Sequence, residues 1–278
     1  MKVVVTGGAG FLGRRLAAAL LTRGALSGAD GGEQAIDELT LFDVVAPEPP
    51  LEDGRVRVVT GDVADREGVA ALIGDGVDSI FHLAAVVSGE AEQNFELGLS
   101  VNLHGTMALL EACRGLDRPP RLVFASSIAA FGGELPEVIG DATPLNPQTS
   151  YGNQKAMAEL LVSDYSRKGF IDGRALRLPT IVVRGGKPNK AASGFASSIV
   201  REPLSGIDYV CPVRPESRMW ILSPRRAVAA FLRAHELPSD SWGVNRVLTL
   251  PGLSISMADT VQAMARVAGR AAAERVSW

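Results

Sequence analysis

Residues 2–13 read KVVVTGGAGFLG, a short apolar run that passes directly into closely spaced glycines. The valines predict a buried strand, and the apolar residues after Gly13 recur at helical spacing. The glycines fit both Gly8-x-Gly10-x-x-Gly13 and Gly7-x-x-Gly10-x-x-Gly13, spacings that allow a tight strand-to-helix turn. Such a turn lets the backbone approach a pyrophosphate, which the N–H groups of the helix terminus then bind. We therefore expect a dinucleotide site formed by Gly7, Gly10, Phe11, Leu12 and Gly13.

Further short apolar runs follow the first one, separated by helical patterns. They occupy residues 39–42, 56–59, 79–83, 122–125 and 175–178. Strands that are buried on both faces and joined through helices are typical of parallel sheets. The sequence therefore predicts an α/β fold, a doubly wound parallel sheet of the Rossmann type.

The local composition of the chain changes after Leu178, where prolines become frequent and the predicted helices and strands become shorter. We expect a cofactor-binding Rossmann domain over residues 1–178. Residues 179–278 are expected to form a smaller lobe that mainly binds substrate, with elements that return to the main sheet.

The composition is that of an ordinary globular protein, with 46% hydrophobic residues, 21% charged residues and a formal net charge of −3. Nothing in it favours a nucleic-acid partner. Cys113 and Cys211 are far apart and lack Cys or His neighbours, so we expect no metal site and a reducing compartment. The first apolar run is too short for a signal peptide, and no run approaches the ~20 residues of a membrane span. We expect a cytoplasmic protein with no membrane partner.

Carboxylates and small residues follow the next predicted strands. Asp43 ends the second strand, where a carboxylate can bind the adenosine ribose and repel a 2′-phosphate, so NAD is predicted rather than NADP. Asp62 and Val63 follow the third strand, where they can contact the adenine. The residues after the fourth strand let the backbone approach the cofactor, and they are Leu83, Ala84 and Ala85.

Tyr151 and Lys155 lie four residues apart in a predicted helix, hence on one face. A phenol ionises near pH 10 in water, but a neighbouring ammonium and a positively charged nicotinamide favour the phenolate. Tyr151 is therefore a candidate general base. Ser126 and Ser127 follow the fifth strand, at the edge where doubly wound sheets bind ligands. Either hydroxyl can hold the substrate oxygen.

The ordered set of motifs resembles the extended short-chain dehydrogenase/reductase superfamily, the NAD-dependent epimerases and dehydratases, over about two thirds of the chain. This resemblance implies that Ser127 is the catalytic serine, acting with Tyr151 and Lys155. It also implies that Lys155 contacts the nicotinamide ribose. Tyr151 then belongs to the NAD site too, together with Asn102, Leu178 and Pro179.

Two departures from the superfamily pattern narrow the expected reaction. Dehydratases of the superfamily have an Asp-Glu pair where this chain has Ile128, Ala129 and Ala130, so dehydration is not expected. After Arg218 the chain reads MWILSPRRA in place of the run with which the epimerases bind a nucleotide. Binding of a nucleotide sugar is therefore not favoured.

Other segments resemble a narrower group, the D-erythronate dehydrogenases, which oxidise the 2-hydroxyl of a four-carbon sugar acid with NAD. They are residues 86–92, 177–180, 187–189 and 223–225. The resemblance implies that Arg218 or Lys187 binds the substrate carboxylate. The hydroxyls would be bound by Ser88, Ser127, Tyr151 and Asn189. For Arg177, a structural ion pair and a ligand contact are equally open.

The resemblance has limits at two places. Gly185 stands where the group has a proline. The group also leads us to expect several dozen residues beyond Trp278, so that the chain would be a truncated form.

The function that we expect is NAD-dependent oxidation of D-erythronate to 2-oxo-erythronate, with a small sugar acid as the partner molecule. A sugar or nucleotide-sugar epimerase is the main alternative, because it would use NAD without net NADH formation. An NAD-binding redox sensor without turnover is a third hypothesis, against which Ser127, Tyr151 and Lys155 argue. A homodimer is compatible with the sequence.

Overall fold

The computed structural model describes residues 1–29, 31–74, 76–140, 142–186 and 190–278. The chain divides into two compact units. The first comprises Met1–Arg177 and Val228–Thr249, and the second comprises Leu178–Ala227 and Leu250–Trp278.

The first unit is built on a seven-stranded sheet in the order β12-β8-β7-β6-β1-β4-β5. β1 pairs in parallel with both β4 and β6, so the chain reverses its winding direction beside β1. This arrangement confirms the predicted doubly wound parallel sheet. The strands are β1 (Lys2–Thr6), β4 (Glu38–Asp43), β5 (Val56–Thr60), β6 (Ser79–His82), β7 (Arg121–Ser127), β8 (Asp172–Leu178) and β12 (Val247–Thr249).

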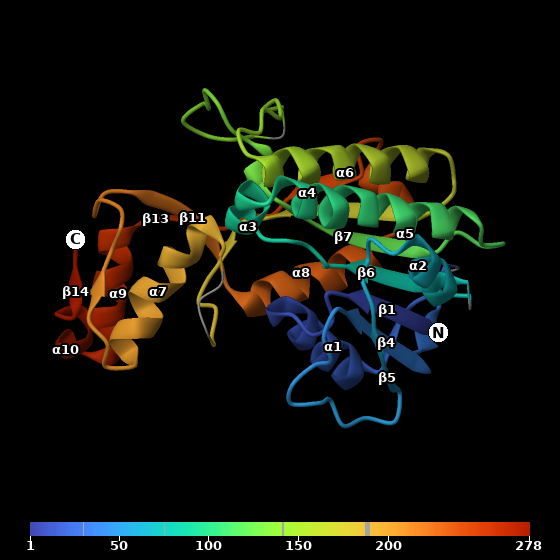
Figure 1. Cartoon of the computed structure of the whole chain (residues 1–278), viewed down its shortest axis with the longest axis horizontal. Coiled ribbons are helices and arrows are strands. Elements are labelled where there is room, and N and C mark those ends of the chain that lie inside the picture. Colours follow the sequence, from blue (N-terminus) through green and yellow to red (C-terminus); the bar gives the residue numbers. More distant parts are fainter. Residues whose placement is uncertain (30, 75, 141, 187–189) are drawn as a thin grey trace. The chain divides into compact units, whose positions relative to one another are not determined.

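Helices cover both faces of this sheet, with α5 and α6 along one face and α1 and α8 along the other (Figure 1). Apolar side chains of α2, α5 and α6, such as Val69, Leu109 and Val162, form one core with Ile80 and Phe124 of the sheet. The helices and helical turns are α1 (Phe11–Arg23), α2 (Arg66–Ile73), α3 (Ser88–Gln93), α4 (Phe95–Gly98), the π-helical η1 (Leu99–His104), α5 (Gly105–Arg114), η2 (Ile128–Ala130), α6 (Ser150–Arg167), α8 (Pro224–Glu236) and η4 (Ser239–Trp242).

A small hairpin separates α1 from β4. Its strands, β2 (Ala25–Ser27) and β3 (Glu33–Ala35), pair antiparallel. The hairpin lengthens the connection between Gly13 and Asp43 beyond the roughly 20 residues typical of a dinucleotide motif. Asp43 nevertheless ends the strand next to β1, as the motif requires.

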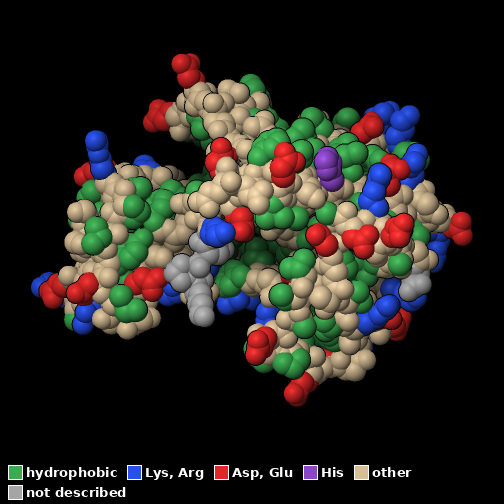
Figure 2. Space-filling view, in the orientation of Figure 1, with side chains coloured by type: hydrophobic (Ala, Val, Ile, Leu, Met, Phe, Trp, Pro, Cys, Tyr) green, Lys and Arg blue, Asp and Glu red, His purple; other side chains and the backbone are tan. Residues whose placement is uncertain are grey.

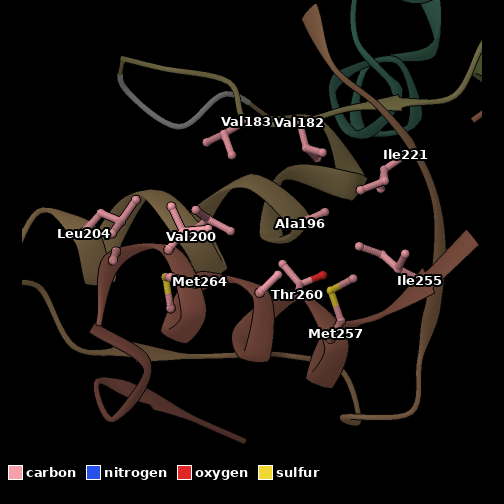
Figure 3. Close-up of a pocket in the computed structure, with 13 residues that line it drawn as sticks. Val182, Val183, Ala196, Val200, Leu204, Ile221, Ile255, Met257, Thr260 and Met264 are labelled. Carbon is pink, nitrogen blue, oxygen red and sulfur yellow. The ribbon is translucent and has the colours of Figure 1, made fainter. Parts of the chain in front are cut away.

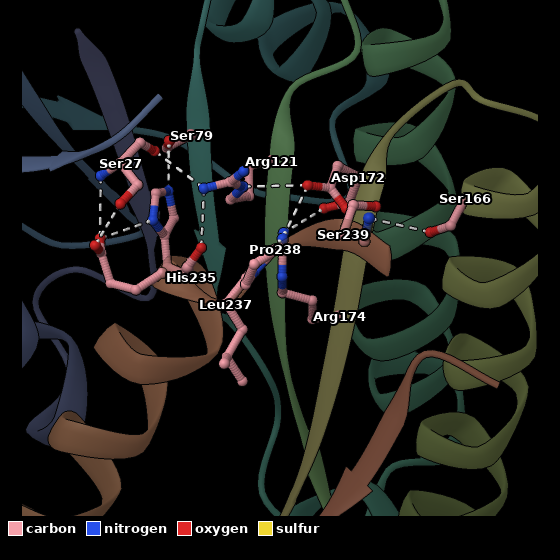
Figure 4. Close-up of polar contacts among 12 residues, drawn as sticks. Ser27, Ser79, Arg121, Ser166, Asp172, Arg174, His235, Leu237, Pro238 and Ser239 are labelled. Atoms are coloured by element: carbon pink, nitrogen blue, oxygen red, sulfur yellow. Dashed lines mark hydrogen bonds and ion pairs between the residues drawn. The ribbon is translucent and has the colours of Figure 1, made fainter. Parts of the chain in front are cut away.

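A polar network joins the amino ends of β7 and β8 to the carboxyl end of α8 (Figure 4). The Asp172 carboxylate accepts from the guanidinium groups of Arg121 (3.1 Å) and Arg174 (2.9 Å). The same guanidinium groups donate to the carbonyl oxygens of His235 and Leu237, where a helix carries partial negative charge. Because it lies at the amino ends of the strands, this network anchors the edge opposite the one where a ligand is expected.

The second unit contains a three-stranded sheet in the order β13-β11-β9 and a short pair, β10 with β14. An apolar hollow of about 320 Å³ lies beside α7 and α9. Figure 3 shows side chains such as Val200, Thr260 and Met264 around it. The elements are β9 (Thr180–Ile181), η3 (Ala192–Gly194), α7 (Phe195–Leu204), β10 (Tyr209–Val210), β11 (Arg218–Leu222), β13 (Leu253–Ser256), α9 (Met257–Ala268), α10 (Arg270–Ala273) and β14 (Val276–Ser277).

Acidic and basic side chains are interspersed over the face of the molecule in Figure 2. Cys113 and Cys211 are buried free thiols. Within the described ranges, no helix is long and apolar enough to span a membrane. The same residues contain no cluster of three His, Cys, Asp or Glu side chains that could hold a metal ion.

Candidate active site

The glycine-rich turn links β1 to α1 and packs against the end of β6. Gly7 has a φ of +70°, and a Cβ atom there would lie 2.8 Å from the Ala84 nitrogen. A Cβ atom at Gly13 would lie 2.0 Å from the Gly7 carbonyl oxygen. Glycine is therefore required at both positions, because a side chain would fill the space between turn, helix and strand. This close packing places the turn at the N-terminus of α1, which Gly10 leaves without a side-chain cap and where anions bind favourably.

Asp43 is fixed beside this turn. Its two carboxylate oxygens accept hydrogen bonds from the backbone N–H groups of Ala9 (3.0 Å) and Val44 (2.8 Å). Each oxygen keeps a further acceptor position, which a ribose hydroxyl can use. Asp62 is held in a similar way after β5, where it accepts from the N–H group of Ala64 (2.9 Å).

Asn102 is buried in the π-helical turn η1 and clamps the segment that follows β6. Its Oδ1 accepts from the Val86 N–H group (2.8 Å), and its Nδ2 donates to the Val86 carbonyl oxygen (3.1 Å). Nδ2 also donates to Oε1 of Gln154 in α6 (2.7 Å). Asn102 thus fixes the backbone just beyond Leu83, Ala84 and Ala85 and connects it to the helix that carries Tyr151.

The structure separates the roles of the two adjacent serines at the end of β7. Ser126 is buried, and its hydroxyl donates to the Glu159 carboxylate. Ser127 is partly exposed, and its Oγ accepts from the Ala129 N–H group (3.1 Å). An acceptor role leaves the hydroxyl proton of Ser127 available for donation to a ligand.

Tyr151 and Lys155 lie in the first two turns of α6, which Thr149 caps by accepting from the Gly152 N–H group. The Lys155 Nζ lies 5.7 Å from the centroid of the Tyr151 ring. It donates to the Ala125 carbonyl oxygen (3.0 Å), which holds it under the end of β7. Burial lowers the pKa of Lys155 to about 7, and the charge of Glu159 opposes this change. Lys155 is therefore a buried amine that gains or loses its proton near neutral pH, and it lies on the same helix face as the phenol.

Comparisons with known proteins agree with this geometry. A sequence model of the NAD dependent epimerase/dehydratase family matches residues 3–237. The chain belongs to this family. It is similar to the D-erythronate dehydrogenase of Cupriavidus necator, with 58% identity over the whole chain and 85% of the relative. It is also similar to the D-erythronate dehydrogenase of Haemophilus influenzae, with 49% identity over the whole chain and 86% of that relative. The crystal structure of a nucleoside-diphosphate-sugar epimerase from Agrobacterium tumefaciens has a TM-score of 0.93 and 44% identity, covering all of this chain and 81% of that one.

NAD is the cofactor of this family, as the sequence predicts. The glycine turn fits it, because Gly10 leaves the N-terminus of α1 without a side-chain cap and the first turn of this helix carries no acidic residue that would repel a pyrophosphate. Gly10, Phe11 and Leu12 complete the turn. The other residues of the first unit that would hold NAD lie after the carboxyl ends of neighbouring strands or on the facing helices, and they are Asp43, Asp62, Val63, Leu83, Ala84, Ala85, Asn102, Tyr151 and Lys155.

Other residues expected in the site belong to α3 or to the second unit. Ser88 begins α3 in the first unit and is partly exposed. Leu178 and Pro179 begin the second unit, which also contains Arg218. The Arg218 guanidinium there donates to the backbone oxygen of Ser254 (2.6 Å) and to its hydroxyl (3.2 Å). Lys187 and Asn189 lie outside the described residues.

Gly152 is a residue of the site that the sequence reasoning missed. A Cβ atom at this position would lie 2.2 Å from the Ala129 carbonyl oxygen. Only glycine therefore lets α6 approach the turn η2 that follows Ser127. A glycine directly after the tyrosine of a Tyr-x-x-x-Lys motif is the signal that could have indicated this contact.

His82 is buried beneath the site and is held between two threonine hydroxyls, those of Thr6 (2.7 Å) and Thr106 (2.9 Å). Its ring stacks on Phe124, and burial, together with the nearby Lys155 charge, lowers its pKa to about 3. The folded protein therefore keeps this imidazole neutral at the pH of ordinary assays.

We expect this histidine to weaken the fold in acid. The unfolded chain binds a proton near pH 6.5 whereas the folded chain does so only near pH 3, so His82 lowers the free energy of unfolding as the pH falls through this window. The loss should amount to several kcal/mol, at about 1.4 kcal/mol for each pKa unit. Urea unfolding across the window should therefore show less acid sensitivity for His82→Gln than for the wild type. Equal sensitivity would contradict this expectation, and His104→Gln, at an exposed histidine, is the control.

Proposed function

We propose that this protein is an NAD-dependent dehydrogenase that oxidises the 2-hydroxyl of D-erythronate to give 2-oxo-erythronate. The observation that carries the proposal is similarity over the whole chain to two D-erythronate dehydrogenases, at 58% and 49% identity. The buried Lys155 beside the Tyr151 ring supports it, because this pair can remove a proton from an alcohol.

The proposed mechanism assigns one task to each of three side chains. The Ser127 hydroxyl donates a hydrogen bond to the oxygen of the substrate 2-hydroxyl and orients it. The Tyr151 phenolate accepts the proton of that hydroxyl, and the Lys155 ammonium stabilises the phenolate. When bound, NAD⁺ supplies the hydride acceptor.

The substrate carboxylate needs a cationic partner. Arg218 is the described candidate, and its guanidinium is exposed on β11 while two of its N–H groups contact Ser254. Lys187 is the second candidate for the carboxylate. We assign the substrate hydroxyls to Ser88, Ser127, Tyr151 and Asn189.

A panel of sugar acids tests the substrate. The protein is mixed with NAD⁺ and each of several four-, five- and six-carbon aldonates, and NADH absorbance is followed. We expect the highest kcat/KM for D-erythronate. NADH formation from none of the aldonates would refute the proposal.

Epimerisation of a nucleoside-diphosphate sugar is the second candidate function. One observation favours it, which is the name of the structural relative from Agrobacterium tumefaciens at 44% identity. An epimerase would use NAD⁺ without net formation of NADH. Incubation with nucleoside-diphosphate sugars, followed by chromatography of the sugars, separates it from the dehydrogenase.

We predict a preference for NAD⁺ over NADP⁺ that depends on Asp43. A carboxylate beside the turn repels a 2′-phosphate, and such like-charge contacts cost several kcal/mol. Asp43→Ala should therefore raise the ratio of kcat/KM for NADP⁺ to that for NAD⁺ at least about tenfold, equivalent to about 1.4 kcal/mol. Asp117→Ala, at an exposed aspartate of the same unit, should leave the ratio unchanged. Equal use of both cofactors by the wild type would contradict the assignment.

The cytoplasmic location and the homodimer remain predictions from the sequence. The buried free thiols of Cys113 and Cys211 support a reducing compartment. Sedimentation of the purified protein would measure the oligomeric state.

A further inference from the structure

Glu159 is a buried carboxylate to which the proposed mechanism gives no task. It lies one helical turn beyond Lys155 and on the same face of α6. Arg177 of β8 donates to it from Nε (3.0 and 3.1 Å) and from Nη2 (2.7 Å). The Ser126 hydroxyl of β7 donates to the same carboxylate. Two neighbouring strands therefore fix the position of this one charge.

These contacts join α6 to the end of β7 at consecutive residues. Lys155 Nζ donates to the Ala125 carbonyl oxygen, and the next residue, Ser126, donates to Glu159. The residue after that is Ser127. Two hydrogen bonds thus connect the helix that carries Tyr151 to the end of the strand that carries Ser127, and Glu159 makes one of them.

We propose that Glu159 is a positioning residue that holds α6 against β7 and keeps the Lys155 ammonium charged beside Tyr151. The inference rests on the proposed roles of Tyr151 and Lys155. Arg177 acts through Glu159, because its guanidinium orients the carboxylate.

The groups around Lys155 support this role. Burial favours the neutral amine, and the charge of Glu159 acts in the opposite direction. From β6, the nearby His82 is neutral at ordinary pH and so supplies no competing positive charge. β7 contributes the Phe124 ring, 4.6 Å from Nζ, and the Ala125 carbonyl oxygen. On α6 itself, Tyr151 is the other titratable neighbour, and the Arg177 charge from β8 is paired with Glu159.

Titration of Lys155 tests the proposal without cofactor or substrate. In protein that carries lysine labelled with carbon-13 at the ε-carbon, the nuclear magnetic resonance signal of Lys155 is the one that vanishes in Lys155→Met. Burial already lowers the pKa of this amine to about 7. Glu159→Gln should shift the midpoint of the Lys155 signal to lower pH by about one unit or more, because the carboxylate no longer stabilises the ammonium.

Two further variants keep the test decisive. Glu159→Gln leaves the Arg177 charge unpaired in a mostly buried place and can fail to fold, so Glu159→Gln combined with Arg177→Gln removes both charges together. Circular dichroism reports which variants are folded, and the double variant should show the same shift. Tyr165→Phe removes the hydrogen bond to Glu111 at the far end of α6 and should leave the Lys155 midpoint unchanged.

The outcomes separate this inference from the proposed function. A folded double variant with the wild-type midpoint would overturn the role of Glu159, even if D-erythronate is the substrate. So would a Lys155 midpoint that stays at the wild-type value in a folded Glu159→Gln variant. If no aldonate is oxidised, the proposed function fails, while a shifted midpoint still supports the positioning role. With an active enzyme, Glu159→Gln should also lower kcat at neutral pH about tenfold or more and change Kd for NAD⁺ less than about threefold.

Discussion

Replacement of Tyr151 with phenylalanine should lower kcat for D-erythronate at least about 100-fold, the lower end of what general-base catalysis contributes. In the proposed mechanism the Tyr151 oxygen accepts the substrate proton, and phenylalanine has no group that can do so. The cofactor is held mainly by the glycine turn and Asp43, so Kd for NAD⁺ should change less than about threefold. Initial rates of NADH formation and calorimetric titration with NAD⁺ measure the two quantities.

Tyr165→Phe is the matched control for this change, because it removes a phenol from the same helix at the end away from Lys155. Its kcat should stay within about twofold of the wild type. If Tyr151→Phe kept more than about one hundredth of the wild-type kcat, Tyr151 would not be the general base.

Replacement of Gly152 with alanine should have a comparably large effect through packing. Alanine normally stabilises a helix interior by about 1 kcal/mol relative to glycine. At this position the added methyl group would lie 2.2 Å from the Ala129 carbonyl oxygen, so α6 must move away from the turn after Ser127. Displacement of a catalytic group by about 1 Å can cost about 100-fold in rate, and we expect kcat to fall by that order. Overpacking should also lower the free energy of unfolding by about 1–3 kcal/mol.

Gly54→Ala provides the comparison, since a Cβ atom at Gly54 has no heavy atom within 4 Å. This variant should match the wild type in kcat and in urea unfolding. Wild-type values for Gly152→Ala would show that α6 and the turn after Ser127 tolerate a wider separation than the structure indicates.

Much of the first unit could be predicted because its strands are continuous apolar runs bounded by turns and helices. β12 could not, because it has three residues and its pairing with β8 joins segments far apart in the chain. The β2–β3 hairpin was also missed, because its glycine-rich centre reads as a plain loop. The segment before α5 forms the π-helical turn η1, a change of hydrogen-bond register that apolar periodicity does not reveal.

The candidate site could be predicted to the level of residue types and their order. Spacing alone left Ser126 and Ser127 as alternatives, and burial of the Ser126 hydroxyl against Glu159 distinguishes them. The sequence left two interpretations of Arg177, a structural ion pair and a ligand contact, and the structure shows an ion pair with Glu159. The sequence places Glu159 four residues after Lys155, hence on the same helix face, but spacing does not show that its carboxylate is buried. The glycine directly after Tyr151 is visible in the sequence, but the distance from a Cβ atom there to the Ala129 carbonyl oxygen comes from the structure.

Deuterium transfer from D-erythronate labelled at carbon 2 tests the central claim most directly. Oxidation of the 2-hydroxyl breaks the bond between carbon 2 and deuterium, so the label must leave the substrate with the hydride. We predict NADH in amounts equal to the substrate consumed, with the deuterium in the NADH when both products are analysed by mass spectrometry. NADH that lacks deuterium, with the label retained in the sugar acid, would contradict oxidation at carbon 2.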